Sequence, residues 1–227
     1  MSGGLFITGT GTDIGKTYIS GLIMKKLISS GRSAAYYKAA VSGNDRDGDL
    51  RLIPGDALFV RKISGSSQKL DTMCPYIYEA AVSPHLAARF EGDPVSLDRV
   101  KEGFDKLCGQ YELVTVEGSG GIVCPIRYDD TKIFLTDIIK ALGLPCLIAA
   151  DAGLGTINAV VLTYEYMLSH GIEARGIILN RYRAGDVMHE DNAFMCEKLT
   201  GLRIIARVPE NAGELDIDIN ELLKLYY

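Results

Sequence analysis

The chain lacks long apolar runs and basic tracts. None of its 227 residues belongs to an apolar run long enough to span a membrane. The net charge is −5 and no basic cluster stands out, which argues against nucleic-acid binding. The first strand pattern begins within about four residues of the start, so we expect no signal peptide. We therefore expect a cytoplasmic protein that binds neither membrane nor nucleic acid.

The chain also lacks the cysteine and histidine spacings of disulfide frameworks and metal sites. Its five cysteines are odd in number and widely separated, and no Cys-x-x-Cys pair occurs. We interpret them as free thiols in a reducing compartment. The three histidines have no partner at metal-ligand spacing, so we treat them as structural or surface residues. The length favours one domain over residues 1–227, and the 47% hydrophobic content is ordinary for a globular protein.

What the chain does have is a regular alternation of strand and helix patterns. The strands are expected at 4–8, 34–38, 112–117, 145–150, 175–180 and 203–207. The helices are expected at 16–30, 56–64, 84–91, 96–109, 132–142, 156–170, 188–200 and 219–225. Most strand patterns are unbroken apolar runs, as in strands covered on both faces. This order predicts an α/β fold with a mainly parallel, doubly wound sheet and helices on both faces.

The most informative segment is GTGTDIGKT, residues 9–17, between the apolar run at 5–8 and a helical pattern. A strand, a glycine-rich turn and a helix that opens on Gly-Lys-Thr is the layout of a phosphate-binding loop, as in P-loop NTPases. Backbone N–H groups cradle phosphate oxygens there, while Lys16 reaches the outer phosphates and the Thr17 hydroxyl ligates magnesium. The loop opens at Gly9 and is one residue longer than the common form. The alternative is a chance match, against which the flanking strand and helix argue.

Polar residues that follow the strands are further candidates, because ligands in such sheets lie beyond the strands' carboxyl ends. Lys38 ends the second strand and is placed to bridge anions, although a single lysine there is more often a solvated surface residue. Asp56 opens a helical stretch; composition alone favours an N-cap, which is compatible with a role in the crevice. Glu117 precedes a run of glycines and is placed as a metal ligand or water-positioning carboxylate, or is an incidental acid in a turn.

Two later strands end in comparable signals. Asp151 and the segment GLGTIN (153–158) form a second glycine-rich helix start, which suits another anion. A plain turn role for Asp151 is equally compatible. Asn180 ends the next strand, and its amide offers the donor and the acceptor that a purine edge requires. A turn asparagine is again equally compatible.

Taken together, these segments resemble one family: dethiobiotin synthetase, the ATP-dependent carboxylase that closes the ureido ring in biotin biosynthesis. The matching segments, in the family's order and spacing, are GTGTDIGKT, YKAAVSG (37–43), GDA (55–57), PYIYEAAVSPH (75–85), VEGSGG (116–121), GLGTIN and Asn180. The resemblance spans almost the whole chain, and the lengthened loop combined with the Tyr-Lys and Val-Glu-Gly segments is specific.

The resemblance implies a role for each matching residue. The implied nucleotide-binding residues are Gly9, Asp13, Ile14, Gly15, Lys16, Thr17, Tyr18, Glu117 and Asn180. The implied magnesium ligands are Thr17, Asp56 and Glu117. The implied catalytic residues are Lys16, Lys38, Thr12 and Ser42. The implied substrate contacts are Thr12, Ser42, Gly118, Gly155, Thr156, Ile157 and Asn158, of which the last four receive the distal carboxylate across a homodimer interface.

The implied reaction joins 7,8-diaminononanoate and CO2 at the expense of MgATP. It runs through a carbamate and a carbamic–phosphoric anhydride, and it yields dethiobiotin, ADP and phosphate. The chain departs from the family at Ala39, Ser119 and the pair Ala81-Val82. At the base site Arg181 stands where the family has aspartate, which leaves the nucleotide preference open.

Three other classes share parts of this pattern. A ParA/MinD-like ATPase switch, which binds a protein partner, usually has a second lysine early in the loop, where this chain has Thr10 and Gly11. An ATP-dependent amidotransferase related to cobyrinic acid synthases would carry a glutaminase domain with its catalytic cysteine. A degenerate, non-catalytic nucleotide binder is the least expected, because the chain keeps the intact set Lys16, Thr17, Asp56 and Glu117.

Overall fold

The computed structural model describes residues 2–227 and confirms the predicted α/β class. A six-stranded sheet has the order β10-β9-β8-β1-β5-β2, and every neighbouring pair is parallel. Its strands are β1 (Gly3–Gly9), β2 (Ala34–Lys38), β5 (Leu113–Glu117), β8 (Cys146–Asp151), β9 (Ala174–Asn180) and β10 (Ile204–Val208). β1 is central and buried along its whole length, as its apolar sequence requires.

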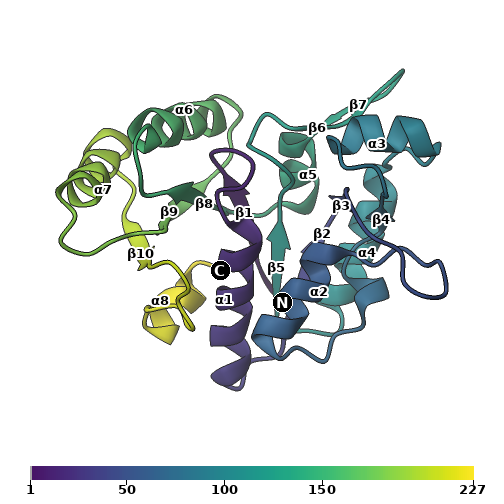
Figure 1. Ribbon diagram of the computed structural model, residues 1–227, viewed down its shortest axis with the longest axis horizontal. Helices are drawn as coiled ribbons and strands as arrows, with labels where there is room; N and C mark the ends of the chain where they lie inside the picture. Colours follow the sequence, from purple (N-terminus) through teal and green to yellow (C-terminus); the bar gives the residue numbers. More distant parts are fainter. Residues whose placement is uncertain (1) are drawn as a thin grey trace.

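Helices cover both faces of the sheet (Figure 1). They are α1 (Lys16–Ser29), α2 (Gly55–Ser64), α3 (Pro84–Glu91), α4 (Leu97–Cys108), α5 (Leu135–Leu142), α6 (Thr156–Ser169), α7 (Val187–Thr200) and α8 (Ile219–Lys224), with a 3-10 turn at Leu70–Thr72. α1, α2 and α8 contribute to one hydrophobic core, and α3 to α7 contribute to the other. Along β1, Leu5 and Ile7 enter the first core and Phe6 the second, because successive side chains alternate across a sheet.

Two small strand pairs lie outside the main sheet and were not predicted. β3 (Ala40–Val41) pairs in parallel with β4 (Tyr76–Ile77), and β6 (Pro125–Tyr128) pairs antiparallel with β7 (Lys132–Phe134). The helix predicted over 132–142 therefore begins only at Leu135. A bond from the Thr131 N–H to Asp129 Oδ1, at 2.8 Å, helps to form the hairpin turn that precedes β7.

The start of α2 also differs from the prediction. The helix begins at Gly55 with Pro54 at the N-cap position, so the N-cap prediction for Asp56 was wrong. Asp56 lies in the first turn of the helix, and its carboxylate is therefore available to another partner. At α3, Ser83 occupies the N-cap position and Pro84 follows it, but the Ser83 side chain makes no capping bond.

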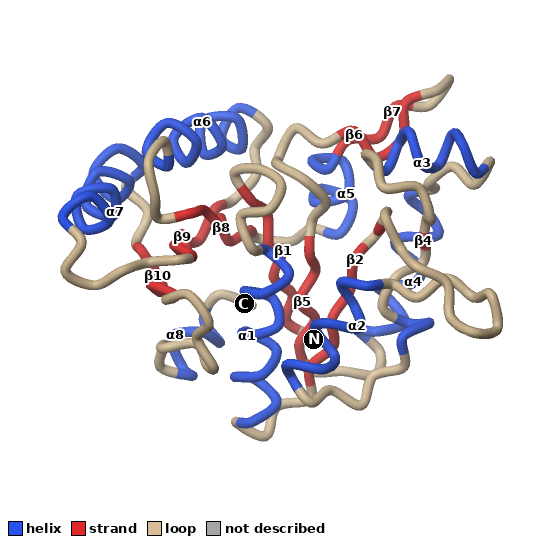
Figure 2. The backbone as a smooth tube through the Cα atoms, viewed as in Figure 1, coloured by secondary structure: helices blue, strands red, loops and turns tan. Residues whose placement is uncertain are grey.

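The carboxyl ends of the parallel strands bring the predicted residues to one edge of the sheet. Gly9, Lys38, Glu117, Asp151 and Asn180 each close a strand. The loops that follow these strands gather at that edge (Figure 2). Within residues 2–227, no helix combines the length and the apolar character needed to cross a bilayer.

Candidate active site

The loop between β1 and α1 has the backbone of an anion-binding turn. Asp13 (φ 58°) and Gly15 (φ 93°) adopt left-handed conformations on either side of Ile14. A Cβ atom at residue 15 would lie 2.0 Å from Nδ2 of Asn180, so only glycine fits there. α1 begins immediately afterwards at Lys16, and its first N–H groups have no partner within the helix. Such a concave set of amides at a helix N-terminus is a site for phosphate.

Lys16 lies within this loop rather than in solvent. Its Nζ donates to the carbonyl of Gly11 at 2.6 Å, and the residue is buried. Burial, aided by repulsion from Lys38, lowers the pKa of Lys16 to about 8, against the opposing attraction of Glu117 and Asp56. The ammonium is therefore held where its charge is poorly compensated, and an incoming phosphate would compensate it.

Lys38 links two strands and a helix in a buried charge cluster. It closes β2 directly beside Glu117 of β5, and its Nζ donates to Glu117 Oε1 at 2.7 Å. The same nitrogen donates to Asp56 Oδ2 at 2.5 Å. Burial opposes the charge of Lys38, but the two carboxylates outweigh it and raise the pKa of Lys38 above its ordinary value. The alternative of a solvated surface lysine was wrong, because the residue is only 6% exposed.

Glu117 is the centre of this cluster and is satisfied on both oxygens. Oε1 also accepts from the Thr17 hydroxyl at 2.8 Å, while Oε2 accepts from the Tyr36 hydroxyl at 2.9 Å. Sequence reasoning did not identify Tyr36. The available signal is its position two residues before Lys38, which places both side chains on the same face of β2.

The oxygen donors of this cluster fit a magnesium ion. Asp56 and Glu117 contact the same lysine nitrogen, and the Thr17 hydroxyl contacts Glu117, so all three donors are close together. Residues 2–227 contain no cluster of three or more acidic, histidine or cysteine ligands. A hydroxyl and two carboxylates leave positions for water and phosphate oxygens, which is how proteins usually hold magnesium.

Two adjoining cavities open on Lys38. One, of about 490 Å³, is lined by Thr12, Asp13, Gly15, Lys16, Thr17, Tyr18, Lys38, Asp56, Phe59, Glu117 and Gly120. The other, of about 580 Å³, contains Ser42 and shares five residues with the first: Thr12, Asp13, Lys38, Asp56 and Gly120. Thr12 and Ser42 are therefore brought together with the lysine, as the site prediction requires. Cys124, a residue that sequence reasoning did not single out, also lines the second cavity.

Other predicted residues do not line these cavities. Gly118 is packed behind Glu117, where its N–H donates to Ile7 at 2.9 Å and a Cβ would press on Phe6 and Leu135. Gly155 is the left-handed N-cap of α6, and the buried Thr156 hydroxyl that follows it has no partner. The lining of the two cavities includes none of the residues 155–158.

The ends of β8 and β9 support the phosphate loop from outside. Asn180 Nδ2 donates to the carbonyl of Ile14 at 2.9 Å. Arg181, at φ 54°, donates from its guanidinium to the carbonyl of Asp13. Asp151 accepts from the N–H of Gly153 at 2.8 Å, so its turn role is confirmed.

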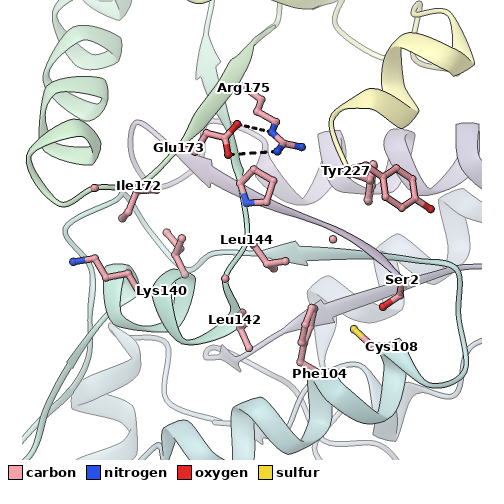
Figure 3. A pocket seen from close by; sticks show the side chains of 16 residues that line it. Ser2, Phe104, Cys108, Lys140, Leu142, Leu144, Ile172, Glu173, Arg175 and Tyr227 are labelled. Atoms are coloured by element: carbon pink, nitrogen blue, oxygen red, sulfur yellow. Dashed lines mark hydrogen bonds and ion pairs between the residues drawn. The ribbon is translucent and has the colours of Figure 1, made fainter.

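A larger cavity, of about 630 Å³, lies at the opposite end of the sheet (Figure 3). It is lined by residues from both chain ends and by the Glu173–Arg175 ion pair, whose Oε1 and Nε atoms are 2.8 Å apart. None of the predicted site residues lines it. The cavities beside the phosphate loop are therefore the candidate active site.

The fold and this loop define a P-loop nucleotide-binding protein. A ParA family ATPase from Chlorobium tepidum has a similar fold, with a TM-score of 0.58 and 14% identity over 100% of this chain and 91% of the other. The family described as AAA domain matches residues 3–214. The ATP-dependent dethiobiotin synthetase BioD of Brachyspira hyodysenteriae is 48% identical over 217 residues, covering 95% of this chain and 96% of that protein. The same-named protein of Clostridium perfringens is 43% identical over 227 residues, covering 100% and 99%. The chain belongs to the dethiobiotin synthetase family.

Proposed function

We propose that this chain is an ATP- and Mg²⁺-dependent dethiobiotin synthetase that joins 7,8-diaminononanoate and CO2. The observation that carries the proposal is the position of Lys38 between two cavities. One is lined by the phosphate loop and the other contains Ser42, while Thr12 lines both. A lysine shared in this way is suited to bridge a nucleotide phosphate and a substrate anion.

The first step forms the substrate's own nucleophile. A neutral amine of the diamine attacks CO2, a C–N bond forms, and loss of the amine proton leaves a carbamate. The Thr12 and Ser42 side chains hold this end of the substrate in the proposal. Ser42 Oγ donates to the Val82 carbonyl at 2.6 Å, which fixes the hydroxyl oxygen as an acceptor for a substrate N–H.

In the second step a carbamate oxygen attacks the γ-phosphorus of ATP, and the bond to ADP breaks. Phosphoryl transfer depends on positioning and charge neutralisation more than on covalent help from the protein. Lys16 and Lys38 supply two positive charges in a buried setting, where electrostatic stabilisation is strongest. Magnesium, held by Thr17, Asp56 and Glu117, would neutralise phosphate oxygens when bound. The second amine then attacks the carbamoyl carbon, and phosphate leaves as the cyclic urea closes.

The distal carboxylate of the substrate is assigned to residues 155–158 of a second copy of the chain. These residues form the start of α6, and they line neither cavity within one chain. The backbone N–H groups of a helix start suit a carboxylate. We therefore propose a homodimer.

We also propose a cytoplasmic location. The five cysteines are free, which supports a reducing compartment.

The deciding experiment is ATP-dependent incorporation of labelled bicarbonate into an acid-stable product. We expect incorporation only when 7,8-diaminononanoate, ATP and Mg²⁺ are all present. ATP hydrolysis without incorporation would contradict the proposed function. Sedimentation at micromolar concentration tests the homodimer, and a fully active monomer would refute a shared substrate site.

A further inference from the structure

Two consecutive residues at the end of β9 hold two consecutive carbonyls of the phosphate loop. Asn180 Nδ2 donates to the Ile14 carbonyl at 2.9 Å. The Arg181 guanidinium donates to the Asp13 carbonyl through Nη2, with Nη1 of the same group 3.4 Å from that oxygen. Neither Asn180 nor Arg181 lines the cavity that the loop encloses, so both approach the loop from outside that cavity.

The direction of these carbonyls determines the direction of the loop amides. In a trans peptide the N–H and the C=O of the same unit point to opposite sides. The Asp13 carbonyl shares its peptide unit with the Ile14 N–H, and the Ile14 carbonyl shares its unit with the Gly15 N–H. Holding both carbonyls toward β9 therefore turns both N–H groups away from β9, as an anion-binding turn requires.

Arg181 is itself fixed by a second contact. Its Nε lies 3.0 Å from Asp151 Oδ2, and the other oxygen of Asp151 accepts from the Gly153 N–H at 2.8 Å. The neighbouring turn is held in addition by Asn192, which donates to the carbonyls of Ala152 and Gly153. The guanidinium therefore lies between an anchored carboxylate and a loop carbonyl: it donates hydrogen bonds to the carbonyl, and it is held to the carboxylate by opposite charge, since its buried Nε makes no hydrogen bond within residues 2–227.

We propose that Arg181 is a positioning residue for nucleotide binding: it preorganises the phosphate loop and does not read the base. The proposal rests on the nucleotide-binding part of the proposed function. It also accounts for the arginine at position 181, where the family has an aspartate at the base site, because this arginine supports the loop and does not contact the base. Because phosphate binding is common to all nucleoside triphosphates, loss of Arg181 weakens all of them by the same factor.

The test is isothermal calorimetry with ATP, GTP and inorganic tripolyphosphate on the full chain. For Arg181→Ala we expect affinity to fall about tenfold for all three ligands, the cost typical of losing a hydrogen bond to a charged group. Arg183→Ala is the matched control, because Arg183 is exposed and its side chain has no recorded partner in the described residues. We expect the control to stay within about twofold of the wild type.

Further variants separate geometry from charge. Arg181→Lys keeps the charge but loses the planar fork, so we expect its affinities to stay close to those of Arg181→Ala. Wild-type affinity in the lysine variant would show that only the positive charge at position 181 matters, and it would overturn the proposal. Asp151→Asn keeps an acceptor for the Gly153 N–H and removes the ion pair. We expect its effect to be smaller than that of Arg181→Ala and not to add to it.

The remaining outcomes are also decisive. A loss confined to ATP, with tripolyphosphate binding unchanged, would mean that Arg181 contacts the nucleoside. Unchanged affinity for every ligand would remove Arg181 from binding altogether. Thermal melting of each variant identifies a general folding defect, and the lysine variant keeps the test available if the alanine variant does not fold. If the wild type bound neither nucleotide nor tripolyphosphate, the proposed function itself would be wrong, and this proposal with it.

Discussion

Replacing Tyr36 by phenylalanine isolates one hydrogen bond beneath the charge cluster. The Tyr36 ring is fully buried, and its hydroxyl donates to Glu117 Oε2 at 2.9 Å. Burial, together with the charge of Glu117, raises the pKa of Tyr36 well above its ordinary value, so the hydroxyl remains a donor at neutral pH. Phenylalanine keeps the shape of the ring, and the change removes a polar contact without opening a large cavity.

The expected cost follows from the state in which Glu117 is left. Its Oε2 would have no donor in a site where the residue is 1% exposed. A hydrogen bond to a charged group contributes about 1.5–3 kcal/mol, so we expect the free energy of unfolding to fall by about 2 kcal/mol. Oε1 keeps Thr17 and Lys38, but the carboxylate becomes free to rotate. Loss of such a supporting partner typically weakens metal binding by about tenfold or more.

Urea unfolding and a magnesium titration of bicarbonate incorporation measure these two effects. Tyr37→Phe is a matched control, because the Tyr37 hydroxyl is also buried but donates to the Val100 carbonyl, at 2.7 Å, on the other face of β2. We expect Tyr37→Phe to cost stability and to leave the magnesium requirement unchanged. A Tyr36→Phe enzyme with the wild-type magnesium requirement and turnover would refute the positioning role of Tyr36.

Three further outcomes follow from the site. Lys38→Ala should lower turnover by about a hundredfold or more in the bicarbonate assay, and near-normal turnover would remove Lys38 from the mechanism. Because the pKa of Lys16 is lowered to about 8, the free protein loses this proton as the pH rises past that value, whereas bound phosphate restores it. ATP affinity should therefore fall above pH 8, and ATP binding there should be accompanied by proton uptake. Calorimetry in buffers of different ionisation enthalpy measures that uptake. Binding without proton uptake would contradict the assignment of Lys16 as a phosphate ligand. Gly15→Ala should abolish ATP binding. Gly31→Ala is the control: residue 31 also has a positive φ, of 82°, but has open space around it, so the change should cost only stability. Equal ATP binding by both variants would argue against phosphate binding by the loop.

The sequence was sufficient to predict the strands of the main sheet and most of the polar residues at their carboxyl ends. Unbroken apolar runs such as that of β1 identify strands buried on both faces, and their carboxyl ends lead directly to Lys38, Glu117 and Asn180. These predictions depend on local patterns and on one general rule about parallel sheets.

The errors arise where position depends on contacts between distant segments. Asp56 looked like a cap because its neighbours show a helix start, but its partner Lys38 is 18 positions away. Tyr36 looked like an ordinary strand residue, since its partner Glu117 belongs to another strand 81 positions later. The β7 segment is three residues long, too short for its period to differ from that of a helix start.

The charge cluster also constrains how the site changes when it is used. Lys38 is buried, and its two recorded partners at Nζ are Asp56 and Glu117, which are also the proposed magnesium ligands. If these carboxylates turn toward a metal ion, the buried ammonium loses its counter-charges, and an unpaired buried charge is strongly unfavourable. Lys38 then requires another anion within reach, and in the proposed reaction that anion is the carbamate or the γ-phosphate. We therefore expect Lys38 Nζ to exchange its carboxylate partners, Asp56 and Glu117, for a substrate anion only when metal, nucleotide and carbamate are present together. This exchange would link productive use of the nucleotide to the presence of the carboxylated diamine.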